Sequence, residues 1–446
     1  MFYRRPQTYG FLPSLTNFEP TSVSEIPAYF NNAINKDRII APIVNDVHKI
    51  GTAKSDVKSQ GTSKKSDSKT ESLLDKFTKS LDRFQRKLYK ATINTLTSIS
   101  PPERRENGIS FVQSGLFVYL VLLALSTETG LQETTEIDKC LEIYTNNTVK
   151  IQIINTVKAL LQIPKSDHLK FQWSHRLSLA AGLNVNKLFT RGGAADALPM
   201  KMHRFNGTES PEELADVLNH MVERDSDGKI RDAFIEEELS SGVRAVLLTT
   251  VYLRSRWRAP VTLLNDTWPF HDHDGAPTRF TKMFRVNDIM RYAALKDWDA
   301  EVVEIPYATS GLTLVVLVPR RYSLRELANY VSNTSLDHIV AKMQTTRVAV
   351  TLPLYTLRMT LLLPNKLQAI GITSLVNWND TETSHSLRLS HAIQRIMFWS
   401  EAGPNAFKDD GIEWDPEPNY SLFINRPHIF FVRWKNMTLL NGNFVL

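Results

Sequence analysis

Helical and strand-like hydrophobic patterns occupy different parts of this chain, and their separation limits the folds open to it. Helical spacing begins near Leu73 and recurs at Val112–Ser126 and across 131–162. Strand-like apolar runs follow at Leu177–Val185, Val243–Leu253, Val302–Ile305, Leu312–Val318, Val348–Leu352 and Ile429–Val432. Because the two patterns do not alternate regularly, the sequence predicts an α+β fold with mixed or antiparallel sheets.

The first 72 residues lack this patterning. Residues 1–50 carry scattered prolines and aromatics without a sustained period, and Gly51–Ser72 consists almost entirely of Ser, Lys, Thr, Asp and Gly. Such a segment buries too little apolar surface to offset the entropy lost on ordering. We therefore predict an irregular tail and disordered linker over 1–72 and one folded domain over 73–446.

Composition excludes several classes of protein. The chain has 446 residues, 42% of them apolar, which is enough for a large core. Cys140 is the only cysteine, so no internal disulfide and no cysteine-based zinc site can form. The net charge of +6 is too small to predict nucleic-acid binding. The apolar run Gly115–Leu125 falls far short of the roughly 20 residues of a membrane span.

Evidence on the cellular compartment is divided. Residues 1–20 contain no apolar stretch of the kind a signal peptide requires, which taken literally indicates a cytosolic protein. Seven Asn-x-Ser/Thr sequons indicate a secreted glycoprotein instead. They begin at Asn146, Asn206, Asn265, Asn333, Asn379, Asn419 and Asn436. We expect a secreted protein whose start is missing or unconventional.

Five sequence blocks, in order between about residue 80 and the C-terminus, resemble the serpin family of serine protease inhibitors. LNHMV with SDGKI at 218–230 is similar to the family pattern INxWV with TxGKI, and LLTTVYLRSRW at 247–257 is similar to LVNAIYFKGxW. The remaining blocks are VEIPY with LVVLVP at 303–319, VTLP with GI at 350–372, and INRPHIFF with LNG at 424–442.

The resemblance implies a fold of three β-sheets with about nine helices and an exposed reactive loop on the C-terminal side. In inhibitory serpins a protease cleaves this loop, which then inserts as a new strand into the main sheet. The acyl-linked protease is dragged along and distorted as stored strain is released. The resemblance implies this mechanism only where the chemistry of the loop is retained.

The loop of this chain departs from the inhibitory pattern at its hinge. The family hinge reads EEGTEAAAAT, whereas residues 401–410 read EAGPNAFKDD, so that on an alignment at Gly403 only Glu401, Gly403 and Ala406 fit. Pro404 falls on the first inserting residue, and proline is largely excluded from central strands. The side chains facing inward would be Pro404, Ala406, Lys408 and Asp410. Burying the two charges costs several kcal/mol per unpaired ion.

Family spacing places the scissile position near 415–417, beside two prolines. The residues concerned are Asp415, Pro416, Glu417 and Pro418. No basic residue lies between Lys408 and Arg426, so the loop offers no basic side chain to the specificity pocket of a trypsin-like protease.

The region that opens for insertion in the family also differs here. Thr249 replaces the usual Asn in the strand block that ends at Trp257, Ile393 falls where the family has His, and Gln394 follows it. We interpret these departures as a relaxed requirement for opening; neutral drift with local repacking is the alternative.

Other constellations indicate no catalysis. His271–Asp274 has metal-ligand residue types, but adjacent residues in an extended loop cannot all face one ion. Asp225–Gly228 resembles the start of a calcium loop, yet its bidentate glutamate position holds Phe234. Lys150, Lys158, Lys165 and Lys170 lie where some serpins bind sulfated polysaccharide, and we interpret them as a solvated surface. We expect no enzyme activity, no cofactor and no metal.

The leading hypothesis is therefore a monomeric, extracellular, non-inhibitory serpin-fold protein, either a carrier of an unknown ligand or a protease-inactive relic. The alternative is a serine-type endopeptidase inhibitor that acts by loop cleavage and insertion through an unusual acidic bait loop. A third hypothesis, a cytosolic scaffold that uses 1–72 to bind partners, depends on the missing signal peptide.

Overall fold

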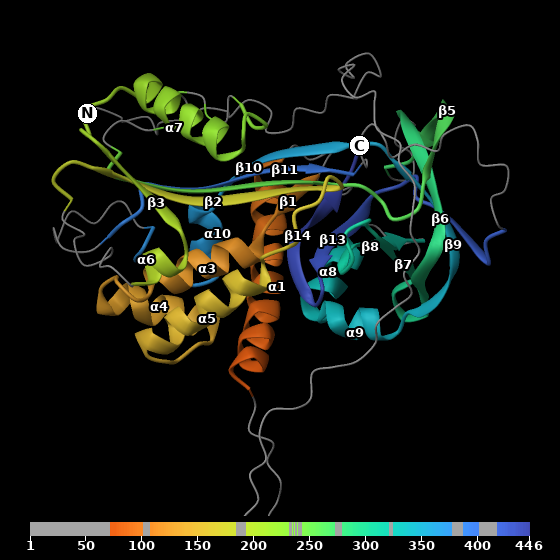
Figure 1. Ribbon diagram of the computed structural model, residues 1–446, viewed down its shortest axis with the longest axis horizontal. Coiled ribbons are helices and arrows are strands. Elements are labelled where there is room, and N and C mark those ends of the chain that lie inside the picture. The colour runs from red at the N-terminus through yellow and green to blue at the C-terminus, as the bar shows by residue number, and fades with distance from the viewer. Residues whose placement is uncertain are drawn as a thin grey trace, which may run out of the picture. The chain divides into compact units, whose positions relative to one another are not determined.

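A computed structural model describes residues 72–100, 108–183, 193–231, 243–272, 279–320, 324–376, 387–400 and 417–446, together with Phe234, Glu236 and Leu239. Its helices are α1 (Leu73–Ile99), α3 (Gly115–Leu125), α4 (Leu131–Leu141), α5 (Asn147–Leu160), α6 (Ala194–Ala197), α7 (Pro211–Asp225), α8 (Leu324–Asn333), α9 (Leu336–Ala341) and α10 (Pro364–Ala369). The longest helices of the first half precede most of the strands (Figure 1), which confirms the predicted α+β class.

The first sheet has five strands in the order β10-β11-β4-β2-β3. Their bounds are β10 (Thr356–Leu362), β11 (His391–Trp399), β4 (Ala245–Ser255), β2 (Leu169–Ala180) and β3 (Met200–Phe205). Strand β2 begins eight residues before the Leu177 expected from the apolar run, because its first half alternates polar and apolar side chains. In Figure 1 α7 lies over one face of this sheet, and α3 and α10 lie on the opposite face.

The second network contains nine strands in the order β1-β14-β13-β8-β7-β6-β9-β12, with β5 also paired to β6. Their bounds are β1 (Phe111–Gln113), β5 (Val261–Phe270), β6 (Arg279–Leu295), β7 (Ala300–Pro306), β8 (Leu312–Pro319), β9 (Gln344–Pro353), β12 (Tyr420–Phe423), β13 (His428–Trp434) and β14 (Met437–Phe444). Two of the three expected sheets form one hydrogen-bonded network because the 17-residue β6 pairs with β5 and β9 and also with β7.

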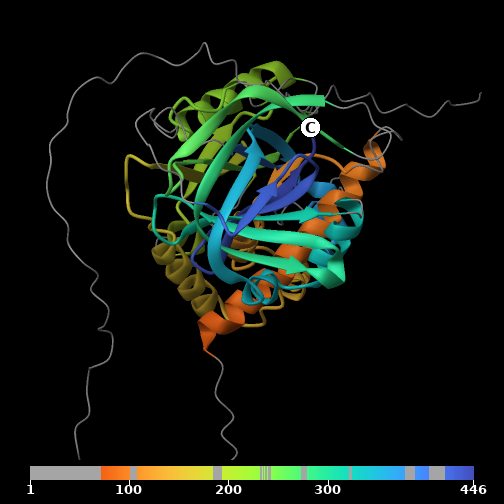
Figure 2. The same cartoon turned by 90° about the vertical axis from the view of Figure 1, so that its right-hand side faces the viewer.

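Helix α3 forms the centre of the core, and every residue from Gly115 to Leu125 is buried. The sequence pattern suggested a helix from Val112, but Val112 belongs to β1 and the helix starts after Ser114. Ser114 is the N-cap: its hydroxyl accepts a hydrogen bond from the Phe117 N–H. Figure 2 shows α1 and α8 side by side, where they pack together at one edge of this core.

Two residues of the resemblance blocks have clear structural roles. Gly442 lies in β14 opposite Val112, where a Cβ atom would collide with the Phe111 carbonyl oxygen. Only glycine permits this close approach of two strands. Asn219, on α7, donates to the Phe234 carbonyl at 3.0 Å and accepts from its N–H at 2.8 Å, which ties the chain after the helix to α7.

Helix α7 has a capped N-terminus and is attached to the five-stranded sheet at its C-terminal end. A capping box between Ser210 and Glu213 starts it, with Pro211 in the first turn. At its C-terminal end the Asp225 carboxylate is fully buried and accepts hydrogen bonds from Arg176 at 2.9 Å and from Lys201 at 2.5 Å. These two cations lie on β2 and β3, so Asp225 holds the helix to both strands.

Asp225→Asn should loosen this attachment, because the neutral amide leaves the buried Arg176 guanidinium without its counter-charge. We expect the free energy of unfolding to fall by about 3 kcal/mol, which urea denaturation measures. Asp227→Asn is the matched control, since Asp227 is exposed and has a positive φ of 56° that asparagine tolerates. Equal losses in both variants would contradict the proposed role of Asp225.

Candidate functional site

The five-stranded sheet is closed at the place where insertion would have to occur. Strands β4 and β11 are parallel neighbours, paired continuously from Val246 with His391 to Leu253 with Phe398. We call this ladder the central seam. A strand inserted between the two would have to break all of its hydrogen bonds and replace them with new ones.

Three polar residues share one register level across the central seam. His175 on β2 pairs with Thr249 on β4, which in turn pairs with Gln394 on β11. Nδ1 of His175 lies 3.0 Å from Oγ1 of Thr249, and each of the three side chains is at most 1% exposed. We call these residues the polar row. It lies on the sheet face that is opposite α7.

The polar row is joined to α3 through Ser114. The Ser114 N–H donates to Oε1 of Gln394 at 2.8 Å, and Nε2 of Gln394 donates to the Ser114 carbonyl at 2.9 Å. The Ser114 hydroxyl donates to the Leu439 carbonyl of β14 at 2.6 Å. One serine at a helix start therefore connects the five-stranded sheet, α3 and the nine-stranded network.

Burial lowers the pKa of His175 to about 3. Its ring centroid lies 5.8 Å from that of Phe117 and 5.5 Å from that of Trp173, and Nε2 has no hydrogen-bond partner among the described residues. The imidazole is therefore neutral at pH 7. Sequence reasoning missed both His175 and Ser114, although Ser114 directly precedes the long apolar run and so has the position of a helix cap.

The four residues expected in the sheet-opening region do not lie together. Thr249 and Gln394 belong to the polar row, whereas Ile393 lies on the outer face of the sheet in the hydrophobic cluster beneath α7. Trp257 stacks on Tyr307 with ring centroids 4.3 Å apart, beyond the end of β4. Gln394, and not its neighbour Ile393, faces Ser114.

Most of the expected reactive loop lies outside the described residues. This applies to the hinge residues Glu401, Gly403, Pro404, Ala406, Lys408 and Asp410, and to Asp415 and Pro416. Glu417 is exposed and Pro418 half-buried, two residues ahead of β12. Six of the seven sequon asparagines are exposed, and Asn379 lies outside the described residues.

The structure corrects one interpretation of the lysines. Lys150 is 1% exposed and forms an ion pair with Asp138 at 2.6 Å, so it belongs to the packing of α4 against α5 and not to a solvated surface. Within the described ranges no group of His, Cys, Asp and Glu side chains could hold a metal ion, and no helix has the length and apolar character needed to cross a membrane.

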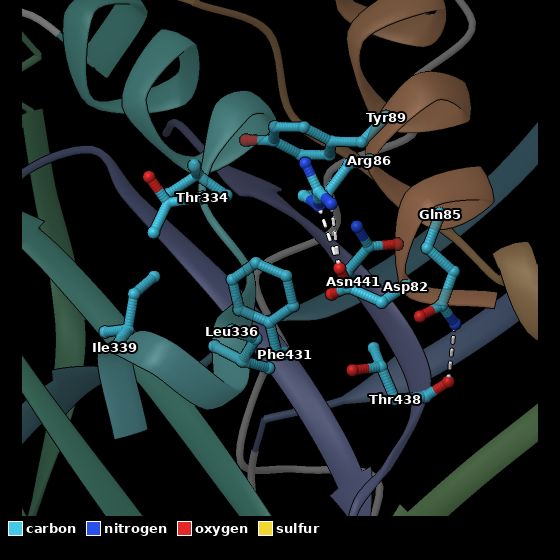
Figure 3. A pocket seen from close by; sticks show the side chains of 11 residues that line it. Asp82, Gln85, Arg86, Tyr89, Thr334, Leu336, Ile339, Phe431, Thr438 and Asn441 are labelled. Atoms are coloured by element: carbon cyan, nitrogen blue, oxygen red, sulfur yellow. Dashed lines mark hydrogen bonds and ion pairs between the residues drawn. The ribbon is translucent and has the colours of Figure 1, made fainter. Parts of the chain in front are cut away.

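A small pocket lies between α1, the α8–α9 connection and β14 (Figure 3). Its space of about 20 Å³ suits a single water molecule. Asp82 and Arg86 form an ion pair on its wall, and Gln85 donates to the Thr438 carbonyl. Oδ1 of Asn441, beside the pocket, is buried and has no hydrogen-bond partner in the part of the chain that the structure describes. The pocket is too small for an organic ligand.

His175 should make stability sensitive to acid. The unfolded chain binds a proton at a histidine near pH ~6.5, whereas the folded chain binds it only near pH 3. Stability is therefore complete above about pH 6.5 and falls as pH drops toward 3, by up to about 1.4 kcal/mol per unit.

Urea denaturation measures the free energy of unfolding at each pH. Between pH 7.5 and about pH 4.5 this free energy should fall less for His175→Asn than for the native chain. The buried His428, whose pKa burial also lowers, to about 4, accounts for a remaining slope. Substitution of the exposed His338 by Asn is the control. An unchanged slope in His175→Asn would show that His175 does not carry the effect.

Comparison with known proteins places this geometry in a family. A family model described as serpin (serine protease inhibitor) matches residues 81–445. Human Serpin B4 is 24% identical over 254 residues, which cover 53% of this chain and 64% of Serpin B4. The chain thus spans less than two thirds of this curated relative.

Two solved structures share the fold. Serpin48 of the insect Tenebrio molitor has a TM-score of 0.69 at 16% identity, and human thyroxine-binding globulin in complex with thyroxine has a TM-score of 0.70 at 17% identity. Each comparison covers 83% of this chain and 98% of the other. Because the family model extends over most of the sequence, we conclude that the chain belongs to the serpin family.

Proposed function

We propose that this serpin is an extracellular binding protein that does not trap proteases by loop insertion. The observation that carries the proposal is the hinge sequence, in which Pro404, Lys408 and Asp410 replace the small residues that suit insertion. The residues around the central seam support the proposal further, because an inserted strand would contact them.

Both faces of the central seam are predominantly apolar. Under α7 an inserted side chain would meet Leu248, Ile393 and Met397, and on the opposite face it would meet Val251 and the rest of the main core. Side chains of a strand alternate between these faces. Whatever its register, the segment 407–410 would direct Lys408 and Asp410 to one face and Asp409 to the other.

No free counter-charge is available for these groups along the central seam. Arg395 is the charged residue that β11 directs to the outer face within the paired stretch, and it already has an interaction partner. Each uncompensated buried ion costs several kcal/mol. Pro404 adds a lost ladder hydrogen bond because it has no N–H group. Insertion would therefore be opposed at the first residue and again at each charge.

The extracellular part of the proposal is supported by the sequons. Asn146, Asn206, Asn265, Asn333, Asn419 and Asn436 are all exposed. The binding part is supported by fold analogy: thyroxine-binding globulin has the same fold and was solved with thyroxine bound. The second candidate function, a serine-type endopeptidase inhibitor with an acidic bait loop, is favoured by the family match itself.

Cleavage within 409–420 should leave the melting temperature nearly unchanged, because a loop that stays outside the sheet adds no new strand. Calorimetry before and after limited proteolysis measures this, with the cut site confirmed by mass spectrometry. A combined variant, Pro404→Thr with Lys408→Ala and Asp410→Ala, lacks all three obstacles to insertion. Its melting temperature should therefore rise distinctly on cleavage.

Glu413→Ala with Glu417→Ala is the matched control, because it removes loop charge outside the hinge. A rise of tens of degrees in the cleaved native chain would overturn the proposal and favour the inhibitor. An SDS-stable complex with any serine protease would have the same meaning.

Native protein purified from its source should lose mass on treatment with peptide-N-glycosidase. Asn206→Gln and Asn265→Gln should each remove one glycan, because both asparagines are exposed. Intact-mass spectrometry provides the readout. A native mass equal to that of the bare polypeptide would contradict an extracellular location.

A further inference from the structure

A large cleft lies between the C-terminal half of α1 and α8, two helices that Figure 2 shows side by side. Its volume is about 960 Å³, within the range of natural ligand sites. The small pocket of Figure 3 lies nearer the middle of α1 and has a different lining. Nothing described so far uses this cleft.

The lining of the cleft combines polar and apolar side chains, and several of its buried members are apolar. Leu96 of α1, Phe111 of β1 and Ala328 of α8 line it, and each is at most 6% exposed. One end is closed where Gly108, at a φ of +85°, packs against Leu324; a Cβ atom at Gly108 would lie only 2.9 Å from Cδ2 of Leu324. This arrangement offers an apolar surface that is open to solvent on one side.

Cations outnumber acids among the lining residues. Lys90 and Arg325 line the cleft from opposite helices, and both are exposed. Neither forms an ion pair with any residue that the structure describes. Glu326, the acidic lining residue, is exposed in the first turn of α8 beside Arg325. The cleft therefore carries a net positive charge.

A buried amide supplies a further donor. Asn443 lines the cleft although it is only 2% exposed. Its Oδ1 accepts a hydrogen bond from the Tyr89 hydroxyl at 2.6 Å, so the tyrosine fixes the orientation of the amide. With Oδ1 engaged by the tyrosine, Nδ2 is the group of this amide that can donate to a ligand oxygen.

We propose that this cleft binds an amphipathic organic anion, a carboxylate that carries an apolar chain. The chain covers Leu96, Phe111 and Ala328, and the carboxylate interacts with the cations of Lys90 and Arg325, while the Asn443 amide can donate to an oxygen of the ligand. The inference rests on the proposed binding role, for which it names a ligand class. It does not involve the loop, so the two proposals can fail separately.

The test uses the full, uncleaved chain and dodecanoate below its micelle concentration, with isothermal titration calorimetry as readout. Dodecyltrimethylammonium, which has the same chain and the opposite charge, is the matched ligand. Lys90→Ala with Arg325→Ala removes the cations of the cleft, and Lys139→Ala with Lys296→Ala removes two exposed lysines elsewhere. Asn94→Trp places a large ring at an exposed lining position of the cleft.

We expect one dodecanoate per chain. The Lys90→Ala, Arg325→Ala variant should bind it about tenfold or more weakly, since charge-assisted hydrogen bonds contribute more than neutral ones. Asn94→Trp should abolish binding, and the control pair should bind as the native chain does. The proposal would be overturned if dodecanoate did not bind, or if both ligands bound equally well. It would also be overturned if Asn94→Trp and the Lys90→Ala, Arg325→Ala variant bound dodecanoate as the native chain does. The loop-cleavage experiment tests the absence of insertion separately, so its outcome does not depend on whether dodecanoate binds.

Discussion

The hydrogen-bonded ladder between β4 and β11 is the constraint on which the rest of this serpin depends. These parallel strands belong to the middle of the five-stranded sheet, and the polar row crosses them. Helix α7 covers one face and α3 supports the other through Ser114 and Gln394. Any movement that parts the two strands must therefore disturb a helix on each side of the sheet as well as the ladder itself.

The covering and supporting contacts differ in kind. Under α7 the contacts are apolar, with Asp225 as the ionic attachment at one end of the helix. At the polar row they are buried hydrogen bonds that join β11 to the start of α3 and β2 to β4, and any of these groups that lost its partner would be left unpaired in the core. The apolar side resists displacement in proportion to area, whereas the polar side resists it in proportion to the number of groups left unpaired.

Much of the fold could be predicted from the sequence, since buried strands such as β8 and β13 are continuous apolar runs and the family blocks fall on them. Edge and half-exposed strands such as β5 and β12 have no such run, so periodicity missed them. The polar row could not be predicted because its members, distant in sequence, meet only through strand register. Counting from Gly403 aligned Ile393 with the family histidine but did not assign a face of the sheet, whereas the strand pairing places Gln394 on the inner face and Ile393 on the outer one.

The pairing of β1 with β14 joins two segments that lie far apart in the sequence, as in the pair Phe111 and Asn443. Nearby, Ser110 and Val445 exchange hydrogen bonds, and Gly442 permits the two strands to approach. A chain emerging from the ribosome therefore has no partner for β1 until β14 has been synthesised. During that interval the buried apolar residues of α3 lack part of their cover, so the nascent protein is exposed to aggregation between the synthesis of α3 and that of β14.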